Sequence, residues 1–132
     1  MKEPGGNINY DRFIAEIMAP LTADNAVVYR PFLCMEQEYD SGVSLKKTGV
    51  NVIEGTYCCH PRLRKIYAKL TGWEVITLFM DIDDRNQRDR VRGRVGELRF
   101  KLFEDKWIPR EREYFSAYSV REYCDYSISV MD

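Results

Sequence analysis

The chain has no long apolar run, no charge excess of one sign and only one histidine, and each absence removes a class of function. No stretch approaches the roughly 20 apolar residues that a membrane-spanning helix needs. The start, residues 1–7, has no apolar segment of the kind found in secretory signals. Twenty basic and twenty-one acidic side chains give a net charge of -1, so no overall field attracts nucleic acid. We therefore expect neither a membrane nor a nucleic-acid partner.

The cysteines form no recognisable metal or disulfide framework. The sequence has no C-x-x-C pair, and the adjacent Cys58, Cys59 and His60 cannot easily close a tetrahedral zinc site. A nucleophilic Cys/His dyad is equally unsupported, because neighbours on a strand point to opposite faces. Four cysteines without an export signal are typical of a reducing cytoplasm, where we expect this protein. We expect Cys58–His60 to be packing residues.

Composition and periodicity indicate a folded single domain, 1–132. The chain is 45% hydrophobic and 13% aromatic, which excludes disorder. Alternation of helices with buried-type strands predicts an α/β domain with a mainly parallel sheet and flanking helices. The predicted helices cover 8–19 (closed by Pro20), 61–70, 84–94 and 97–118, and the predicted strands cover 26–29, 50–54, 75–80 and 126–130.

A carboxylate follows the clearest predicted strand. Glu54 ends the run 50–54 and Gly55 comes next, at the strand end where open α/β sheets bind ligands. A carboxylate there can hold Mg²⁺ through water, and a glycine lets a phosphate approach closely. The alternative interpretation is a strand-end glutamate in solvent.

The predicted helix 84–94 contains five arginines in the ten residues 85–94. Arg90 and Arg94 share a face at i,i+4, and together they could bind one anionic group through parallel hydrogen bonds. The alternative is a solvated helix face paired with Asp84 and Asp89. The sequence offers no phosphate-binding loop to support the anion-binding interpretation. The stretch nearest to G-x-x-x-x-G-K-[ST], 42–48, lacks the second glycine and a Lys-Ser/Thr pair following it.

Five segments, in order and over nearly the whole chain, resemble the bacterial uridine kinase-like P-loop kinases. The segments 3–13, 29–34, 51–61, 107–115 and 121–125 are similar to that family's E-P-G-G-N-x-D-Y-E-R-F, Y-R-P-[FY]-[DN]-C, V-V-E-G-S-Y-S-x-H-P, W-I-P…E-x-Y-F and R-E-x-C-D. The resemblance implies ATP-dependent phosphoryl transfer to the 5′-hydroxyl of a nucleoside, uridine or cytidine. ATP and Mg²⁺ are the implied cofactors, and the implied fold is the three-layer P-loop kinase fold.

The resemblance also assigns roles to residues on the phosphate side. Glu54 takes the place of the family's acid near Mg²⁺, so it is implied as a metal and cofactor ligand. Arg90 and Arg94 take the places of lid arginines that contact the phosphates of ATP, and they are the implied catalytic residues. Asp89 stands where the family often has a further arginine, which is a departure from the pattern.

On the substrate side, the resemblance implies a pocket for the nucleoside. Tyr29 and Arg30 fall in the segment that lines this pocket, and Asn9 falls where the family usually has an aspartate for the ribose. The change from aspartate to asparagine removes a carboxylate acceptor.

In the family, a P-loop strand, its helix and a second strand precede the E-P-G-G-N segment. We therefore expect a fold that misses its first β-α-β segment, with Met1 an internal methionine of a longer gene or with a partner chain supplying the rest. A chain without the P-loop and the general base should be inactive by itself. The alternative is a non-catalytic remnant that binds a nucleotide or a protein. Apolar strands without their central neighbour favour a homo-oligomer.

Overall fold

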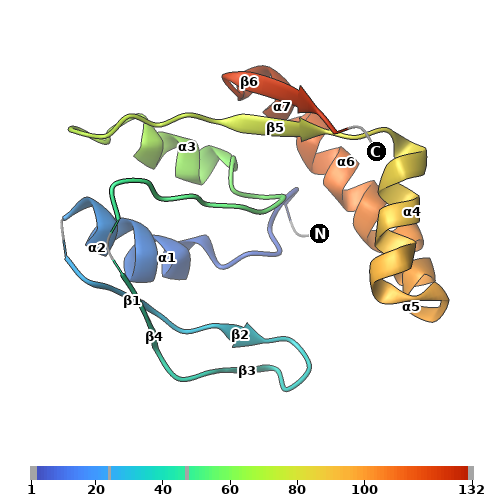
Figure 1. Cartoon of the computed structure of the whole chain (residues 1–132), viewed down its shortest axis with the longest axis horizontal. Coiled ribbons are helices and arrows are strands. Elements are labelled where there is room, and N and C mark those ends of the chain that lie inside the picture. Colours follow the sequence, from blue (N-terminus) through green and yellow to red (C-terminus); the bar gives the residue numbers. More distant parts are fainter. Residues whose placement is uncertain (1–2, 24, 47, 131–132) are drawn as a thin grey trace.

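Short strands are grouped between residues 27 and 45, and helices predominate between residues 84 and 123 (Figure 1). The computed structural model describes residues 3–23, 25–46 and 48–130. The helices are α1 (Tyr10–Phe13), α2 (Ala19–Thr22), α3 (Pro61–Tyr67), α4 (Asp84–Val95), α5 (Glu97–Leu102), α6 (Ile108–Ala117) and α7 (Val120–Tyr123), with π-helical turns η1 (Ile14–Met18) and η2 (Phe103–Trp107). The strands are β1 (Val27–Tyr29), β2 (Phe32–Leu33), β3 (Glu38–Tyr39), β4 (Val43–Leu45), β5 (Leu78–Asp81) and β6 (Tyr126–Ser129).

Two prolines lie inside helical segments, and each follows a π-helical turn. Pro20 comes two residues after η1, and Pro109 comes two residues after η2. A proline has no N–H to donate and its ring clashes with the carbonyl of residue i−4 in an α-helix, whereas the wider π turn relaxes that contact. The prediction that Pro20 ends its helix is therefore wrong, because the helix continues to Thr22.

Local capping signals fix both ends of α4 and the start of α3 as the sequence predicts, whereas α3 ends at Tyr67 and not at residue 70. The Asp83 carboxylate accepts the backbone N–H groups of Arg85 and Asn86, both at 3.0 Å, and so begins α4. Gly96, with a φ of 77°, ends it. His60 accepts the backbone N–H of Arg62 at 3.3 Å and begins α3.

The predicted parallel sheet with helices on both faces is wrong. The strands form three separate two-stranded sheets, and β1–β4 and β2–β3 are antiparallel. Among the described residues, only β5 and β6 pair in parallel, with Leu78 opposite Tyr126 and Asp81 opposite Ser129. The fold is thus a mixed arrangement of helices and small sheets, without the extended parallel sheet of the three-layer kinase fold.

The segment 50–54 shows why the prediction fails. It is irregular rather than a strand, and its Val50 and Val52 side chains are 78% and 85% exposed. A β-branched run permits a strand, but a strand also needs a partner backbone, and no described segment pairs with it. Likewise β5 is covered on one face only, where Phe79 packs against Phe115 of α6 with ring centroids 5.1 Å apart. Leu78 and Met80 remain half-exposed.

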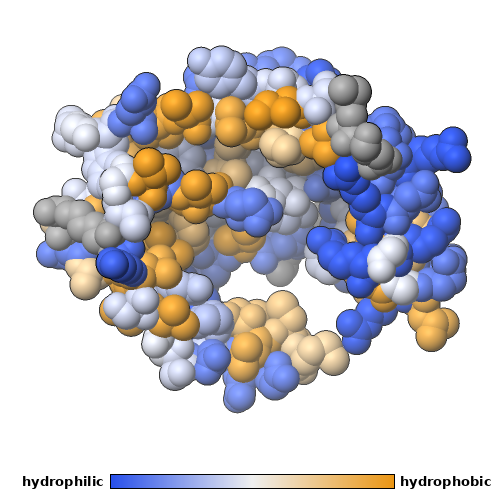
Figure 2. All heavy atoms as spheres, viewed as in Figure 1, coloured by the Kyte–Doolittle hydropathy of each residue, from blue (hydrophilic) through white to orange (hydrophobic). Residues whose placement is uncertain are grey.

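The core lies where the segment before α1, the turn before α3 and helix α6 meet. Tyr114 is completely buried, and it packs with Cys59 and Val120. The glycine at position 5 is required there: its φ is 75°, and an added Cβ would lie 2.8 Å from the Tyr114 ring. Hydrophilic residues cover the α4–α5 end, whereas hydrophobic ones lie exposed along β5 (Figure 2). Among the described residues, no helix is long and apolar enough to cross a membrane.

Candidate functional site

A hollow of about 460 Å³ lies between the helix that begins at Tyr10 and the strands β1 and β2. Its lining includes Asn9, Tyr29 and Arg30, the three residues that the sequence assigns to the substrate. These residues come from the N-cap of α1 and from the end of β1, twenty positions apart in the sequence. The fold therefore brings the predicted substrate residues together on one surface. The other residues of the lining are mostly apolar or aromatic: Ile8, Phe13, Ile17, Pro31, Phe32 and Tyr39.

The carboxylate of Glu16, which two arginines hold, lines this hollow. Arg12 donates from Nε to the Glu16 carboxylate at 3.0 Å, and Arg30 donates from Nη2 at 2.7 Å and from its backbone N–H at 3.0 Å. These hydrogen bonds, those from Arg12 first, lower the pKa of Glu16 to about 2. The same carboxylate raises the pKa of Arg12. The Glu16 carboxylate is therefore ionised at neutral pH, and its hydrogen bonds with Arg30 tie the helix to the end of β1.

The two guanidinium groups also lie on the ring of Tyr39. The guanidinium carbon of Arg12 is 4.0 Å from the ring centroid of Tyr39, and that of Arg30 is 5.3 Å away. Phe32 packs against Tyr39 with ring centroids 5.2 Å apart, so the β2–β3 hairpin supplies an aromatic wall. Sequence reasoning missed this wall, because nothing in a polar loop predicts which ring returns to the helix. The i,i+4 spacing of Arg12 and Glu16 was a signal that could have been used.

Asn9 has a structural duty as well as a place in the hollow. Its Oδ1 accepts the backbone N–H of Arg12 at 3.1 Å and caps α1. This leaves the Nδ2 amide, which is a donor, for a ligand. An aspartate would cap the helix equally well and would offer an acceptor instead. The departure from the family pattern thus changes the polarity of the contact without costing the helix its cap.

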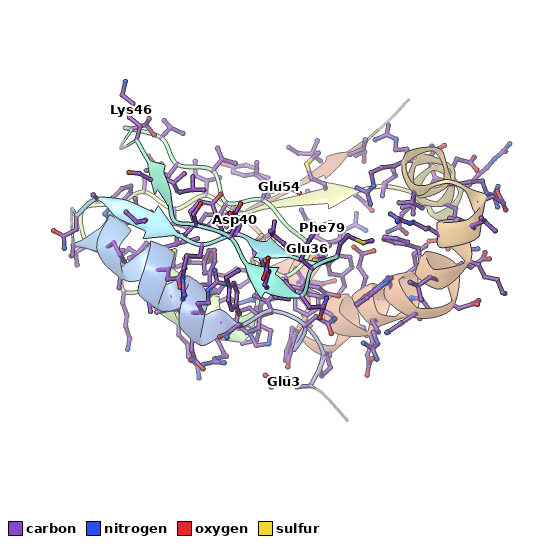
Figure 3. The ribbon with its side chains drawn as sticks, turned by 90° about the horizontal axis from the view of Figure 1, so that it is seen from below. Glu3, Glu36, Asp40, Lys46, Glu54 and Phe79 are labelled. Atoms are coloured by element: carbon purple, nitrogen blue, oxygen red, sulfur yellow. The ribbon has the colours of Figure 1, made fainter. Side chains whose placement is uncertain are left out.

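The phosphate-side residues are not brought together. Glu54 is exposed in the irregular segment between β4 and α3, near the middle of the molecule and away from α4 (Figure 3). Arg90 and Arg94 lie exposed on α4, at the opposite end of the molecule from α1 and β1 (Figure 1). Neither arginine nor Glu54 lines the substrate hollow. The described residues also contain no cluster of three or more His, Cys, Asp or Glu side chains that could hold a metal ion. The residues implied for Mg²⁺ and ATP therefore do not form a cradle that fits them.

A second hollow, of about 600 Å³, lies at the carboxyl end of β5 between α4 and α6. Its two arginines are paired: Arg121 with Asp81 and Arg112 with Asp84, each at 2.6 Å. Further polar groups there are satisfied, since Gln87 donates to Glu111 at 2.5 Å. Because each of its arginines already has a carboxylate partner, this hollow is not preorganised for a phosphate.

Comparison with known proteins adds no assignment: no family model, curated protein or solved structure matches this chain. The proposed function therefore rests on the geometry of the hollows and on the residues that line them.

Proposed function

We propose that the hollow lined by Asn9, Tyr29 and Arg30 binds a nucleoside, and that this chain supplies the nucleoside-binding part of a uridine kinase-like phosphotransferase. The observation that carries the proposal is the convergence of these three residues. They were selected from two separate sequence motifs, and they line one hollow. Its volume of about 460 Å³ lies within the usual range for small-molecule sites.

The chemistry of the lining suits a nucleoside. A flat base can pack against the aromatic side chains of the lining that the arginines leave uncovered, Tyr29 and Phe32. The ribose hydroxyls and the base carbonyls need donors, which Asn9 Nδ2 and the half-exposed guanidinium of Arg30 provide. The Glu16 carboxylate holds Arg30 in place before any ligand arrives, and such preorganisation lowers the entropic cost of binding.

We further propose that this chain by itself binds without turnover. Phosphoryl transfer needs donors that hold the transferring phosphate and a base that orients the hydroxyl. The sequence contains no G-x-x-x-x-G-K-[ST] loop, and the described residues leave Glu54 apart from Arg90 and Arg94. Uridine and cytidine are accordingly ligands of this chain, and the transfer of phosphate requires parts that these residues do not provide.

Calorimetric titration with uridine, cytidine and free ribose tests the proposal. We expect uridine or cytidine to bind with a dissociation constant of about 1 mM or tighter, which corresponds to about -4 kcal/mol, and ribose to bind more weakly. Arg30→Lys keeps the charge but loses the planar fork, so it should weaken nucleoside binding about tenfold. Arg121→Lys is the matched control, because Arg121 is an ion-paired, exposed arginine of the second hollow.

A second variant separates binding from folding. Asn9→Asp keeps the helix cap and exchanges a donor for acceptors, so nucleoside affinity should change several-fold while the melting temperature stays the same. The proposal is overturned if neither nucleoside binds more tightly than ribose, or if Arg30→Lys and Arg121→Lys bind nucleoside equally well.

A further inference from the structure

Two thiols that are far apart in the sequence lie side by side in the core. The Sγ atoms of Cys59 and Cys124 are 3.9 Å apart, although 65 positions separate the two residues. Cys59 is only 6% exposed, and Cys124 is half-buried at the end of α7. Cys58, next to Cys59, is half-buried as well. Three of the four cysteines thus gather around Tyr114 and Val120.

Neighbouring side chains hold these thiols in position. Arg64 of α3 donates from Nε to the carbonyl of Cys59 at 2.6 Å, and its guanidinium carbon lies 3.9 Å from the ring centroid of Tyr123. Because Tyr123 directly precedes Cys124, this one arginine contacts both cysteine-bearing segments. The Tyr67 hydroxyl donates to the carbonyl of Cys58 at 2.9 Å. The proximity of the two sulfurs is therefore built into the packing of α3 against α7.

The three thiols differ in reactivity. A hydrogen bond from the Cys59 thiol lowers the pKa of Cys58 to about 7. The pKa of Cys59 is raised, because its proton is shared with Cys58 and because it is buried. Burial also raises the pKa of Cys124. Cys58 is thus the most acidic of the three thiols, and it is also more exposed than Cys59, so an oxidant can reach it. The thiolate is the form that attacks oxidants.

We propose that Cys59 and Cys124 form a reversible disulfide when a peroxide oxidises the protein, and that Cys58 is the residue through which the oxidant enters. The bridge would join the turn before α3 to the junction of α7 and β6. Oxidation would therefore join these two segments by a covalent bond, at a place separate from the nucleoside hollow.

The chemistry balances in three steps. The Cys58 thiolate attacks a peroxide oxygen, the O–O bond breaks, and after protonation one water leaves and a Cys58 sulfenic acid remains. The Cys59 thiol displaces that oxygen as a second water and forms a bond to Cys58. Cys124 then gives up its proton and attacks the Cys59 sulfur, which releases the Cys58 thiolate. Overall, two thiols and one hydrogen peroxide become one disulfide and two waters.

The bond between adjacent cysteines is an intermediate and not the product. Consecutive Cα atoms are about 3.8 Å apart, which is shorter than the roughly 4.4–6.8 Å that an unstrained disulfide spans. Cys59 and Cys124 face each other without that restriction. Their bridge would close a long loop in the unfolded chain, so we expect the melting temperature of the oxidised form to rise by on the order of 10 °C.

The experiment uses the full chain with Cys34→Ser, because Cys34 is exposed on the β2–β3 hairpin and would cross-link copies. The reduced protein is treated with an equimolar amount of hydrogen peroxide, and free thiols, intact mass and disulfide-linked peptides are measured. We expect the loss of two thiols and two hydrogen atoms, one linked peptide pair carrying Cys59 and Cys124, and full reversal by dithiothreitol.

Variants separate the entry thiol from the bridge. Cys124→Ala should abolish the linked pair, whereas Cys58→Ser should give the same bridge at a rate at least tenfold lower. Circular dichroism shows whether each variant folds, and the linked-peptide map of the Cys34→Ser chain gives the answer even if a variant does not. A final bridge between Cys58 and Cys59, irreversible oxidation of Cys58 without a bridge, or an unchanged thiol count overturns the proposal.

Discussion

The imidazole of His60 stacks on the phenol ring of Tyr10, with ring centroids 4.3 Å apart and an interplanar angle of 20°. His60 is 2% exposed, and among the described residues its Nε2 has no hydrogen-bond partner. Tyr10 donates its hydroxyl to the carbonyl of Gly5 at 2.8 Å. The stack joins the start of α1 to the cap of α3, so the substrate hollow and the cysteine cluster share one core.

This stack makes stability depend on pH. Burial lowers the pKa of His60, so the folded state binds fewer protons than the unfolded state, where a histidine has a pKa of about 6.5. The contribution of neutral His60 is therefore complete above that pKa and is lost as the pH falls through the lower folded pKa. We expect the melting temperature to fall as the pH is lowered from 7 to 5.

His60→Asn is the control for this prediction, because asparagine caps α3 and does not titrate. Since His60 is the only histidine of the chain, the variant should melt at a lower temperature, and this temperature should depend on pH less steeply than that of the wild type over the same range. Equal pH slopes for the two proteins would contradict the assignment.

The ion pairs of Glu16 with Arg12 and Arg30 should be lost in acid, at a much lower pH than the contribution of His60. The pKa of Glu16 is about 2 when it is held by Arg12 and Arg30, which is below its value in an unfolded chain. Its contribution is present above the unfolded pKa and is lost as the pH falls through the folded one. We expect wild type to melt at a higher temperature than Glu16→Gln at pH 7. The difference in melting temperature should shrink below pH 4 and disappear near pH 2. A difference that persists there would contradict a stabilising role of these ion pairs.

The conformation and the contacts of Gly5 can be separated with two substitutions. Gly5 and Gly72 have nearly the same φ, 75° and 78°, but only at Gly5 would a new Cβ meet other atoms. Gly72→Ala should cost about 1–2 kcal/mol, from the left-handed backbone alone. Gly5→Ala should cost about 2 kcal/mol more, because the Tyr114 ring must move. Urea unfolding measures both values, and equal losses would show that Tyr114 yields easily.

We expect no measurable nucleoside kinase activity from this chain. A coupled ADP-release assay with uridine, cytidine and Mg-ATP checks this, and turnover above about 1 s⁻¹ would contradict it. Mg-ATP should bind more weakly than about 1 mM, because Glu54 lies apart from Arg90 and Arg94. A micromolar dissociation constant that is lost in Arg94→Ala would show that α4 forms a phosphate site after all.

Self-association stays a prediction, and the exposed side of β5 and β6 is where it would act. The register places Leu78 beside Tyr126 and Met80 beside Ile128, and all four side chains are exposed. Apolar strand surfaces of this kind invite pairing with another chain. Ile76 lies two residues before β5 and its side chain is also exposed. Light scattering should detect a homo-oligomer that Ile76→Lys weakens, whereas a monodisperse monomer of 15.6 kDa would contradict the prediction.

Local signals in the sequence determined both ends of α4 and the start of α3. Asp83 begins α4 and Gly96 ends it because the cap needs only a carboxylate and a residue tolerant of a positive φ. Motif similarity also selected Asn9, Tyr29 and Arg30, which the fold gathers in one hollow. The helix caps depend only on residues that are neighbours in the sequence. The hollow depends on two motif segments that contact each other in the fold.

Tertiary structure decided what local signals could not. The run 50–54 has strand propensity, yet it has no partner among the described strands and stays irregular, because a strand is stabilised by a second backbone that propensity cannot supply. The contact of Tyr39 with Arg12, the Arg30–Glu16 pair and the contact between Cys59 and Cys124 join residues that are distant in sequence. These residues are close because of how their segments pack. Bringing each pair together lowers the chain entropy, and burial of the shared core offsets that loss.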